Sequence, residues 1–322
     1  VYPSHRTAVL PETANQVIKA EGPKIDIKDG HITGRVYSTV PFPVPATGEE
    51  AIQNHILRHI GGSYEREHNW LAVLFNGEVY KGGRADRVVT AANFEPPQGG
   101  NLAVALVGRF TAPAIFEGTT QLVHEPIDQF AEKRSAWIYN AGQRRVRHAP
   151  DLAYDTFADG TKGLRTTDQY QAYNGATDRY DWKLVGKKEM YVPYNTYRIG
   201  DKKLKYKDIV DTHTIRSDLM RYELHRVWVV DATLKDDMRH AYGRRTFYLD
   251  EDSWMIVGED AYDTRGNLWR VGVHGVRQNY DALVPWYGVQ IWHDLNNGAY
   301  LADGLDNEIK APIVFGKKAK WA

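Results

Sequence analysis

Residues 221–234 read RYELHRVWVVDATL, and apolar and polar residues alternate along most of this stretch. A period of two is typical of a β-strand that buries one face. Four similar stretches follow after short polar turns, at residues 240–249, 254–262, 268–280 and 285–295. Loops of about five residues join only antiparallel neighbours, because a parallel crossover needs about a dozen residues or more. The region from Arg221 to Leu301 therefore predicts an antiparallel meander.

The chain before this region has the same texture. Residues 70–75 precede Asn76-Gly77-Glu78, and an Asn-Gly pair supplies the positive φ angles of a tight hairpin turn. Further strands are expected at 102–111, 115–124, 135–139 and 144–148, the last two as a hairpin. Together with the meander they predict a mainly β protein (α+β) with one antiparallel sheet of roughly ten strands or more.

One segment has helical rather than strand periodicity. Thr47-Gly48-Glu49-Glu50 is a capping-box pattern, and apolar residues follow it at helical spacing until Gly61-Gly62. We expect an amphipathic helix over residues 47–60 that lies across a face of the sheet.

Two other segments differ from the strands. Residues 1–46 contain six prolines and little periodicity, so they are expected to form an extended N-terminal arm. Residues 149–180 interrupt the strands with glycines and a proline, and they are expected to act as a lid or plug. The remaining chain, residues 47–322, is expected to form a single domain.

The composition excludes several classes of partner and chemistry. Lys plus Arg and Asp plus Glu are both 41, which removes the electrostatic reason to expect nucleic acid or an anionic membrane. The absence of cysteine excludes disulfides and zinc–cysteine sites. No apolar run is long enough for a transmembrane helix, and we expect no signal peptide within these residues. Because Val1 is not a methionine, we expect a processed or truncated start.

The titratable residues match no complete metal-binding or catalytic motif. His55 and His59 have the spacing at which two imidazoles share a metal, but Ile56 stands where a metalloprotease has glutamate. The acidic turn at residues 250–252 lacks the glycine and distal glutamate of a calcium loop. No nucleophile elbow, phosphate loop or dinucleotide fingerprint occurs. We therefore assign no catalytic residue, metal or cofactor.

The aromatic content is the strongest remaining signal, with 20 Tyr and 9 Trp in the chain. Such residues often line strand faces and binding clefts. In each strand the bulky apolar members of one alternating set are expected to line an apolar cavity on the concave side of a curved sheet. The residues assigned to this cavity are Trp228, Val230, Trp254, Ile256, Trp269, Val271, Val289 and Ile291, with Trp137 and Tyr139 as neighbours. The alternative is that some of them pack beneath the helix at His55 as core.

Several longer motifs carry a family resemblance. They are AWIYNAGQRRVR at 136–147, GLRTTD at 163–168, DRYDWKLVGKK at 178–188, RYELHRVWVV at 221–230 and FYLDEDSW at 247–254. The chain resembles the outer-membrane lipoprotein-sorting-protein-like family of Gram-negative bacteria (domain of unknown function family 1329). The resemblance covers nearly the whole chain.

The resemblance implies a fold similar to the periplasmic Lol lipoprotein carriers. Such a fold is a strongly curved antiparallel sheet, an unclosed barrel, whose apolar concave face is covered by helices and holds acyl chains. It further implies a removed signal peptide, a missing N-terminal segment and a periplasmic location, in some cases with outer-membrane association. The implied partners are an outer-membrane channel-like protein and an inner-membrane efflux-type lipid transporter. The resemblance does not identify any functional residue in this chain.

These observations favour a non-enzymatic periplasmic carrier or chaperone. Its ligand would be a lipid, a lipoprotein acyl chain or another hydrophobic molecule on its way to or across the outer membrane. One alternative is an envelope hydrolase that acts on a glycan or lipid head group with paired carboxylates. Another is a structural subunit of an envelope complex, which would expose a large apolar patch. The shape and lining of any cavity separate the three.

Overall fold

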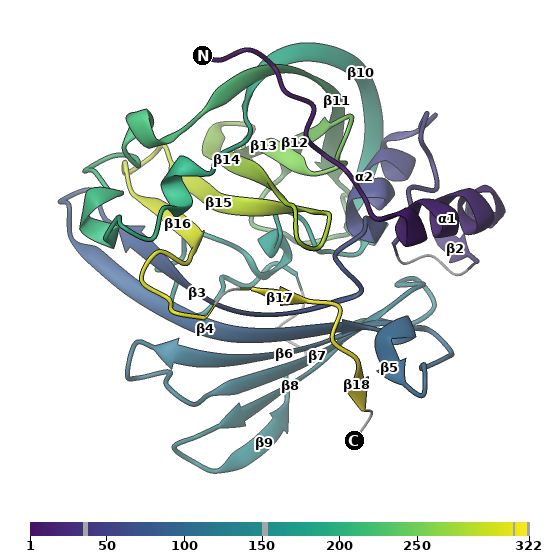
Figure 1. Ribbon diagram of the computed structural model, residues 1–322, viewed down its shortest axis with the longest axis horizontal. Coiled ribbons are helices and arrows are strands. Elements are labelled where there is room, and N and C mark those ends of the chain that lie inside the picture. Colours follow the sequence, from purple (N-terminus) through teal and green to yellow (C-terminus); the bar gives the residue numbers. More distant parts are fainter. Residues whose placement is uncertain (35–37, 150–153, 312, 321–322) are drawn as a thin grey trace.

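The computed structural model describes residues 1–34, 38–149, 154–311 and 313–320 (Figure 1). Residues 35–37 of the expected arm and 150–153 of the expected lid lie outside the described residues. The helices are α1 (Glu12–Glu21) and α2 (Gly48–Leu57). The strands are β1 (Asp26–Lys28), β2 (His31–Thr33), β3 (Ser63–Val73), β4 (Val79–Thr90), β5 (Phe94–Glu95), β6 (Leu102–Ala112), β7 (Thr120–Pro126), β8 (Ser135–Asn140), β9 (Arg145–His148), β10 (Tyr180–Pro193), β11 (Tyr222–Leu234), β12 (Arg244–Asp250), β13 (Ile256–Tyr262), β14 (Leu268–Asn279), β15 (Val284–Asp294), β16 (Tyr300–Leu305), β17 (Val314–Phe315) and β18 (Ala319–Lys320).

One large sheet dominates the molecule. Its order is β10-β11-β12-β13-β14-β15-β16-β3-β4-β6-β7-β8-β9, with β17 added beside β3. The predicted meander is β11 to β16, and the predicted hairpin around Asn76-Gly77 joins β3 to β4. The two halves of the chain meet where β16 pairs with β3 in antiparallel register, with Leu71 opposite Ala302. The prediction of a large antiparallel sheet that does not close is confirmed, since β10 and β9 remain its edges (Figure 1).

The sheet wraps around residues 154–179, which we call the plug. Asp168 of the plug contacts Arg245 on β12, and Tyr170 donates a hydrogen bond to Asp86 on β4. Strands β12 and β4 lie in opposite halves of the sheet, so only a curved sheet brings both to the same segment. The face that meets the plug is called the concave face, and the opposite face the outer face.

Bulges contribute to this curvature. Among the described strands, register shifts interrupt the pairing at seven places, for example between Leu184 and Gly186 on β10 and between Gly275 and Val276 on β14. A bulge bends its strand and increases the local twist, which closes an open sheet towards a barrel. Beyond each bulge, the other alternating set of residues on that strand faces the concave side.

Helix α2 confirms the helix expected from the capping box. The Thr47 hydroxyl accepts a hydrogen bond from the Glu50 amide at 3.1 Å, and the Glu50 carboxylate accepts one from the Ala46 amide at 2.6 Å. The helix lies against β10 and β11. Its buried His55 places one ring nitrogen 3.0 Å from the carbonyl oxygen of Trp254 and the other 3.0 Å from that of Gln171. The helix is thus fixed to the sheet and to the plug.

The N-terminal arm contains more structure than the expected extended chain. Helix α1 occupies the ten residues between Pro11, its N-cap, and Gly22. No proline interrupts this window, and it holds several good helix formers, so a helix can form there. Residues 2–9 do run extended over the sheet, where the Tyr2 amide bonds to the Tyr222 carbonyl at 2.9 Å.

The outer face is also covered in the C-terminal half. Residues 194–221 cross it, and at one point Thr196 lies so close to Gly275 that a Cβ there would meet its Oγ1 at 2.9 Å. Isoleucines 199, 209 and 215 of this segment pack against Val289 and Ile291 of β15. Strands such as β15 are therefore buried on both faces, and their sequence reads as continuously apolar rather than alternating.

Candidate functional site

Four hollows follow one another between the concave face and the elements that cover it. The largest, about 510 Å³, lies between α1 and the ends of β4 and β6 and is called the α1 groove. The smallest, about 20 Å³, lies beside α2 and the β1–β2 hairpin, and a middle hollow of about 50 Å³ lies beneath the end of α2. The inner hollow, about 70 Å³, lies between β3, β4, β6 and β7 and the plug.

Shared lining residues show that these hollows are neighbours in a row. Ala103 and Ile127 line both the α1 groove and the smallest hollow. Ile56 lines the smallest and the middle hollow. Leu106 and Tyr170 line the middle and the inner hollow. The row leads from α1 at the side of the molecule to the interior of the curved sheet.

The α1 groove has a largely apolar wall, to which Glu21 of α1 adds a carboxylate. Val17 of α1 and Leu102 of β6 contribute to it, together with alanines and glycines from both sides. His59 also lines it, with Nδ1 at 3.2 Å from the Ser38 hydroxyl. Burial lowers the pKa of His59 to about 4, so this imidazole is neutral at neutral pH. Such a wall suits an apolar ligand.

The inner hollow has one apolar side. Trp70 and Phe110 pack edge to face with their ring centroids 6.1 Å apart, and Leu106 and Val123 complete this side. Gly108 on β6 leaves space for the guanidinium of Arg84 from β4, because a Cβ at this position would overlap it. The glycine thus allows an arginine to lie flat against the concave face.

The other side of the inner hollow is charged. Asp86 lies 2.6 Å from Nε of Arg84 and 3.2 Å from Nε2 of His68, and the opposite nitrogen of His68 lies 3.0 Å from Asp303. Burial alone would raise the pKa of Asp86, but the charge of Arg84 and the hydrogen bond from His68 hold it well below its usual range. Both carboxylates are engaged within the protein.

Arg165 of the plug differs from these paired groups. Its side chain is 10% exposed, and the carboxylate of Asp303 lies 3.9 Å away, beyond hydrogen-bonding distance. Nε of Arg165 is buried without a hydrogen-bond partner among the described residues. The guanidinium carbon lies 5.6 Å from the ring centroid of Trp292. Burial lowers the pKa of Arg165, which reflects the cost of holding this charge away from water.

The structure divides the residues predicted to line a cavity. Trp228, Val230, Trp254 and Ile256 come together in one buried cluster with Ile52 of α2. In this cluster the rings of the two tryptophans stack with their centroids 6.2 Å apart. The other six residues lie elsewhere, with Val289 and Ile291 beneath residues 194–221, Trp269, Val271 and Trp137 half-buried, and Tyr139 exposed.

None of the ten residues contributes to the walls of the four hollows described above, whereas Trp137 lines a separate hollow of about 270 Å³. Their role in ligand binding stays a prediction.

The charged residues of the inner hollow were not found from the sequence. One signal for them exists, because alternation along β4 places Gly82, Arg84 and Asp86 on one face of a central strand, where charges are unusual. A second signal in the sequence is the family motif at residues 163–168, which contains Arg165.

The two histidines considered for a metal have separate partners. His55 lies between the carbonyl groups of Trp254 and Gln171, and burial together with the charge of Arg58 lowers its pKa well below the usual value. His59 faces Ser38. Within the described residues these two side chains do not form a group of converging metal ligands.

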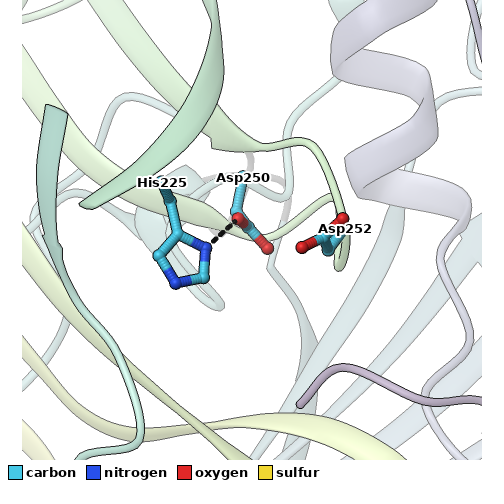
Figure 2. Close-up of side chains that lie close together, drawn as sticks. All are labelled: His225, Asp250 and Asp252. Atoms are coloured by element: carbon cyan, nitrogen blue, oxygen red, sulfur yellow. Dashed lines mark hydrogen bonds and ion pairs between the residues drawn. The ribbon is translucent and has the colours of Figure 1, made fainter. Parts of the chain in front are cut away.

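Another set of potential metal ligands does converge. Figure 2 shows His225 on β11 beside Asp250 and Asp252, with ligand atoms within 4.8 Å of one another. Each has protein partners, since His225 Nδ1 lies 3.1 Å from Asp250, and Asp252 is paired with Arg6 of the arm. Ser253 donates from its amide and its hydroxyl to Asp250. In the described structure the cluster therefore joins the arm to the sheet.

Comparison with known proteins gives a family and related folds. A family model described as "Protein of unknown function (DUF1329)" matches residues 1–322. A protein of Pseudomonas aeruginosa, "Uncharacterized protein PA3922", is 44% identical over 323 residues, which cover 99% of this chain and 71% of that protein.

Solved structures show the same fold at low sequence identity. A putative outer membrane lipoprotein-sorting protein domain from Vibrio parahaemolyticus superposes with a TM-score of 0.55 at 12% identity, covering 83% of this chain and 91% of that one. A DUF1329 family protein from Desulfovibrio piger superposes with a TM-score of 0.51 at 14% identity, covering 76% and 83%. Both likenesses concern the fold.

Proposed function

The chain belongs to the DUF1329 family, and on this premise we propose that it is a non-enzymatic carrier for a lipid, an acyl chain or another hydrophobic molecule. The observation that carries the proposal is the α1 groove of about 510 Å³, which lies between α1 and the ends of β4 and β6 in an open antiparallel sheet. Ligand pockets in proteins typically have about 300 to 1,000 Å³ and mainly apolar walls. The groove falls within this range.

Burial of an acyl chain supplies enough free energy for such a role. Each methylene removed from water contributes about 0.8 kcal/mol. The methylenes of a 16-carbon fatty acid, about 14, therefore supply about 11 kcal/mol, and about 7 kcal/mol remain when association and ordering cost about 4 kcal/mol. Micromolar binding requires about 8 kcal/mol. A carrier needs affinity in this range, since it must also release its ligand.

The location and partners form the second part of the proposal. The Vibrio parahaemolyticus structure of similar fold is described as an outer membrane lipoprotein-sorting domain. By analogy, this chain would work in the periplasm of a Gram-negative bacterium and move its ligand towards the outer membrane. An outer-membrane channel-like protein and an inner-membrane efflux-type lipid transporter are the partners that we propose. No helix within the described residues combines the length and the apolar character that a membrane span requires.

The hydrolase alternative has less support. It needs a carboxyl group that can carry a proton at neutral pH. Of the carboxylates that line the inner hollow, Glu125 is paired with Arg134 at 2.7 Å, and burial raises the pKa of Asp159. Asp86 and Asp303 contact His68 of the lining, and interactions with arginine and histidine outweigh burial and hold the pKa of both carboxyls below the usual range. Both are therefore ionised and unsuited to act as a general acid.

Binding of a fluorescent 16-carbon fatty acid tests the proposal. We expect saturable micromolar binding to the wild type and about tenfold weaker binding to Val17→Asp, which places a charge in the α1 groove. The matched control is Gln16→Asp, which changes an exposed neighbour on the same helix and should bind like the wild type. Lack of saturable binding, together with a lipid-free protein in native mass spectrometry, would overturn the carrier function.

A further inference from the structure

Arg165 is a buried cation that lacks a close counterion. Its side chain lines the inner hollow, is 10% exposed and has an Nε atom without a hydrogen-bond partner. A buried charge is normally paired and hydrogen-bonded, since an unpaired one loses its hydration without compensation. The carboxylate of Asp303 lies 3.9 Å away and is hydrogen-bonded to His68 instead. An anionic ligand would supply the missing acceptor.

The other charged groups around the hollow, apart from the exposed Asp159, have partners of their own. Arg84 contacts Asp86 and donates to Gln121 at 3.1 Å. Arg134 is paired with Glu125 at 2.7 Å. The remaining charged groups are His68, between Asp86 and Asp303, and the exposed Asp159 of the plug, which also lines the hollow. Arg165 thus differs from Arg84 and Arg134, because its nearest carboxylate lies 3.9 Å away rather than 2.6 or 2.7 Å.

We propose that the inner hollow binds the anionic group of an amphiphile, a carboxylate or a phosphate, with Arg165 as its main partner. This inference rests on the proposed carrier function and names the class of ligand. The planar guanidinium can donate two parallel hydrogen bonds to such a group. Trp70, Leu106 and Phe110 provide the adjoining apolar surface, and the row of hollows leads from there towards the α1 groove. The anionic group lies inside and the chain extends towards α1.

Three probes test the proposal: hexadecanoate, hexadecanol and inorganic phosphate. For the wild type we expect hexadecanoate to bind about tenfold more tightly than hexadecanol, as a charge-assisted hydrogen bond predicts. Arg165→Gln should abolish this preference and leave hexadecanol binding unchanged. The control Arg109→Gln, an exposed arginine on β6, should retain the preference. Competition by inorganic phosphate at millimolar concentration would show that the site accepts a free anion as well as a lipid head group.

Each failure has a separate meaning. Equal affinity of the wild type for hexadecanoate and hexadecanol would overturn the anion site while the carrier function stands. Arg165-dependent binding of phosphate without binding of either lipid would support the anion site and contradict the carrier function. Absence of binding by all three probes would contradict both. If Arg165→Gln does not fold, the comparison of the two lipids on the wild type still decides.

Discussion

Arg245 on β12 and Asp168 in the plug form an ion pair with 2.6 Å between Nη1 and Oδ2, and both side chains are almost fully shielded from solvent. Arg245 also holds Glu259 on β13, with Nε 2.7 Å from Oε1. Burial alone would raise the pKa of Asp168, but Arg245 and His240 lower it below the usual range. The plug is therefore attached to the C-terminal half of the sheet by charges that remain ionised.

Removal of one partner should destabilise the fold strongly. We expect Asp168→Ala to lower the free energy of unfolding by about 3 to 5 kcal/mol, because Arg245 then keeps a buried charge with one counterion fewer. The control is Asp155→Ala at the more exposed end of the plug, whose pair with Arg179 spans 3.6 Å. For this control we expect the free energy of unfolding to fall by less than about 1 kcal/mol. Chemical denaturation measures both, and similar losses would contradict an anchoring role of Asp168.

The stability should fall as the pH is lowered into the acid range. Interactions with arginine and histidine outweigh burial at Asp86, Asp168 and Asp303 and lower their pKa values. The unfolded chain then takes up protons first, below about pH 4, so the stabilisation is present above this pH and is lost as the pH falls. Denaturation midpoints measured between about pH 5 and pH 2.5 test this. Asp168→Asn should show a shallower decline, and a flat profile for the wild type would contradict the prediction.

The strands and the covering helix were accessible from the sequence. Short polar turns identified the meander, Asn76-Gly77 identified a hairpin, and the Thr47 cap identified α2. These signals are local, since they depend on φ angles and on hydrogen bonds between residues close in sequence.

The lining of the site was not accessible in this way. Bulges shift which residues of a strand face inward, and coverage of both faces makes Val227 to Val230 buried without alternation. The inner hollow combines Arg84 from the sheet with Arg165 from a segment about eighty residues further along the chain. Such a pairing depends on the tertiary fold, and no local pattern specifies it.

The N-terminal arm should loosen as the pH rises. His225 contacts Asp250 and Glu223, and the Glu223 carboxylate accepts a hydrogen bond from the His5 amide at 2.6 Å. Burial would lower the pKa of His225, but the two carboxylates outweigh it and raise the pKa. A raised pKa stabilises the folded state fully below the ordinary value of about 6.5, and this stabilisation is lost as the pH rises through the raised pKa.

Hydrogen exchange measures this loosening directly. We expect the protection factors of the Tyr2 and His5 amides, which both bond to β11, to fall between about pH 6 and pH 9. The Leu74 amide in the β3–β4 hairpin serves as the control, because it bonds to the Glu78 carbonyl far from His225. If the protection factors of Tyr2 and His5 change with pH in the same way as that of Leu74, His225 has no role in holding the arm.

The last prediction separates core packing from ligand contact at two tryptophans assigned to the cavity from the sequence. Trp228 is buried and stacks on Trp254, so Trp228→Ala should cost about 3 to 5 kcal/mol of stability. Trp269 is half-buried and donates to Asp294 at 2.9 Å, so Trp269→Ala should cost less. Thermal melting and hexadecanoate titration are measured on each variant. If both melt below the wild type yet keep full affinity, neither indole contacts the ligand. A loss of affinity larger than the loss of stability would place that tryptophan in the binding cavity.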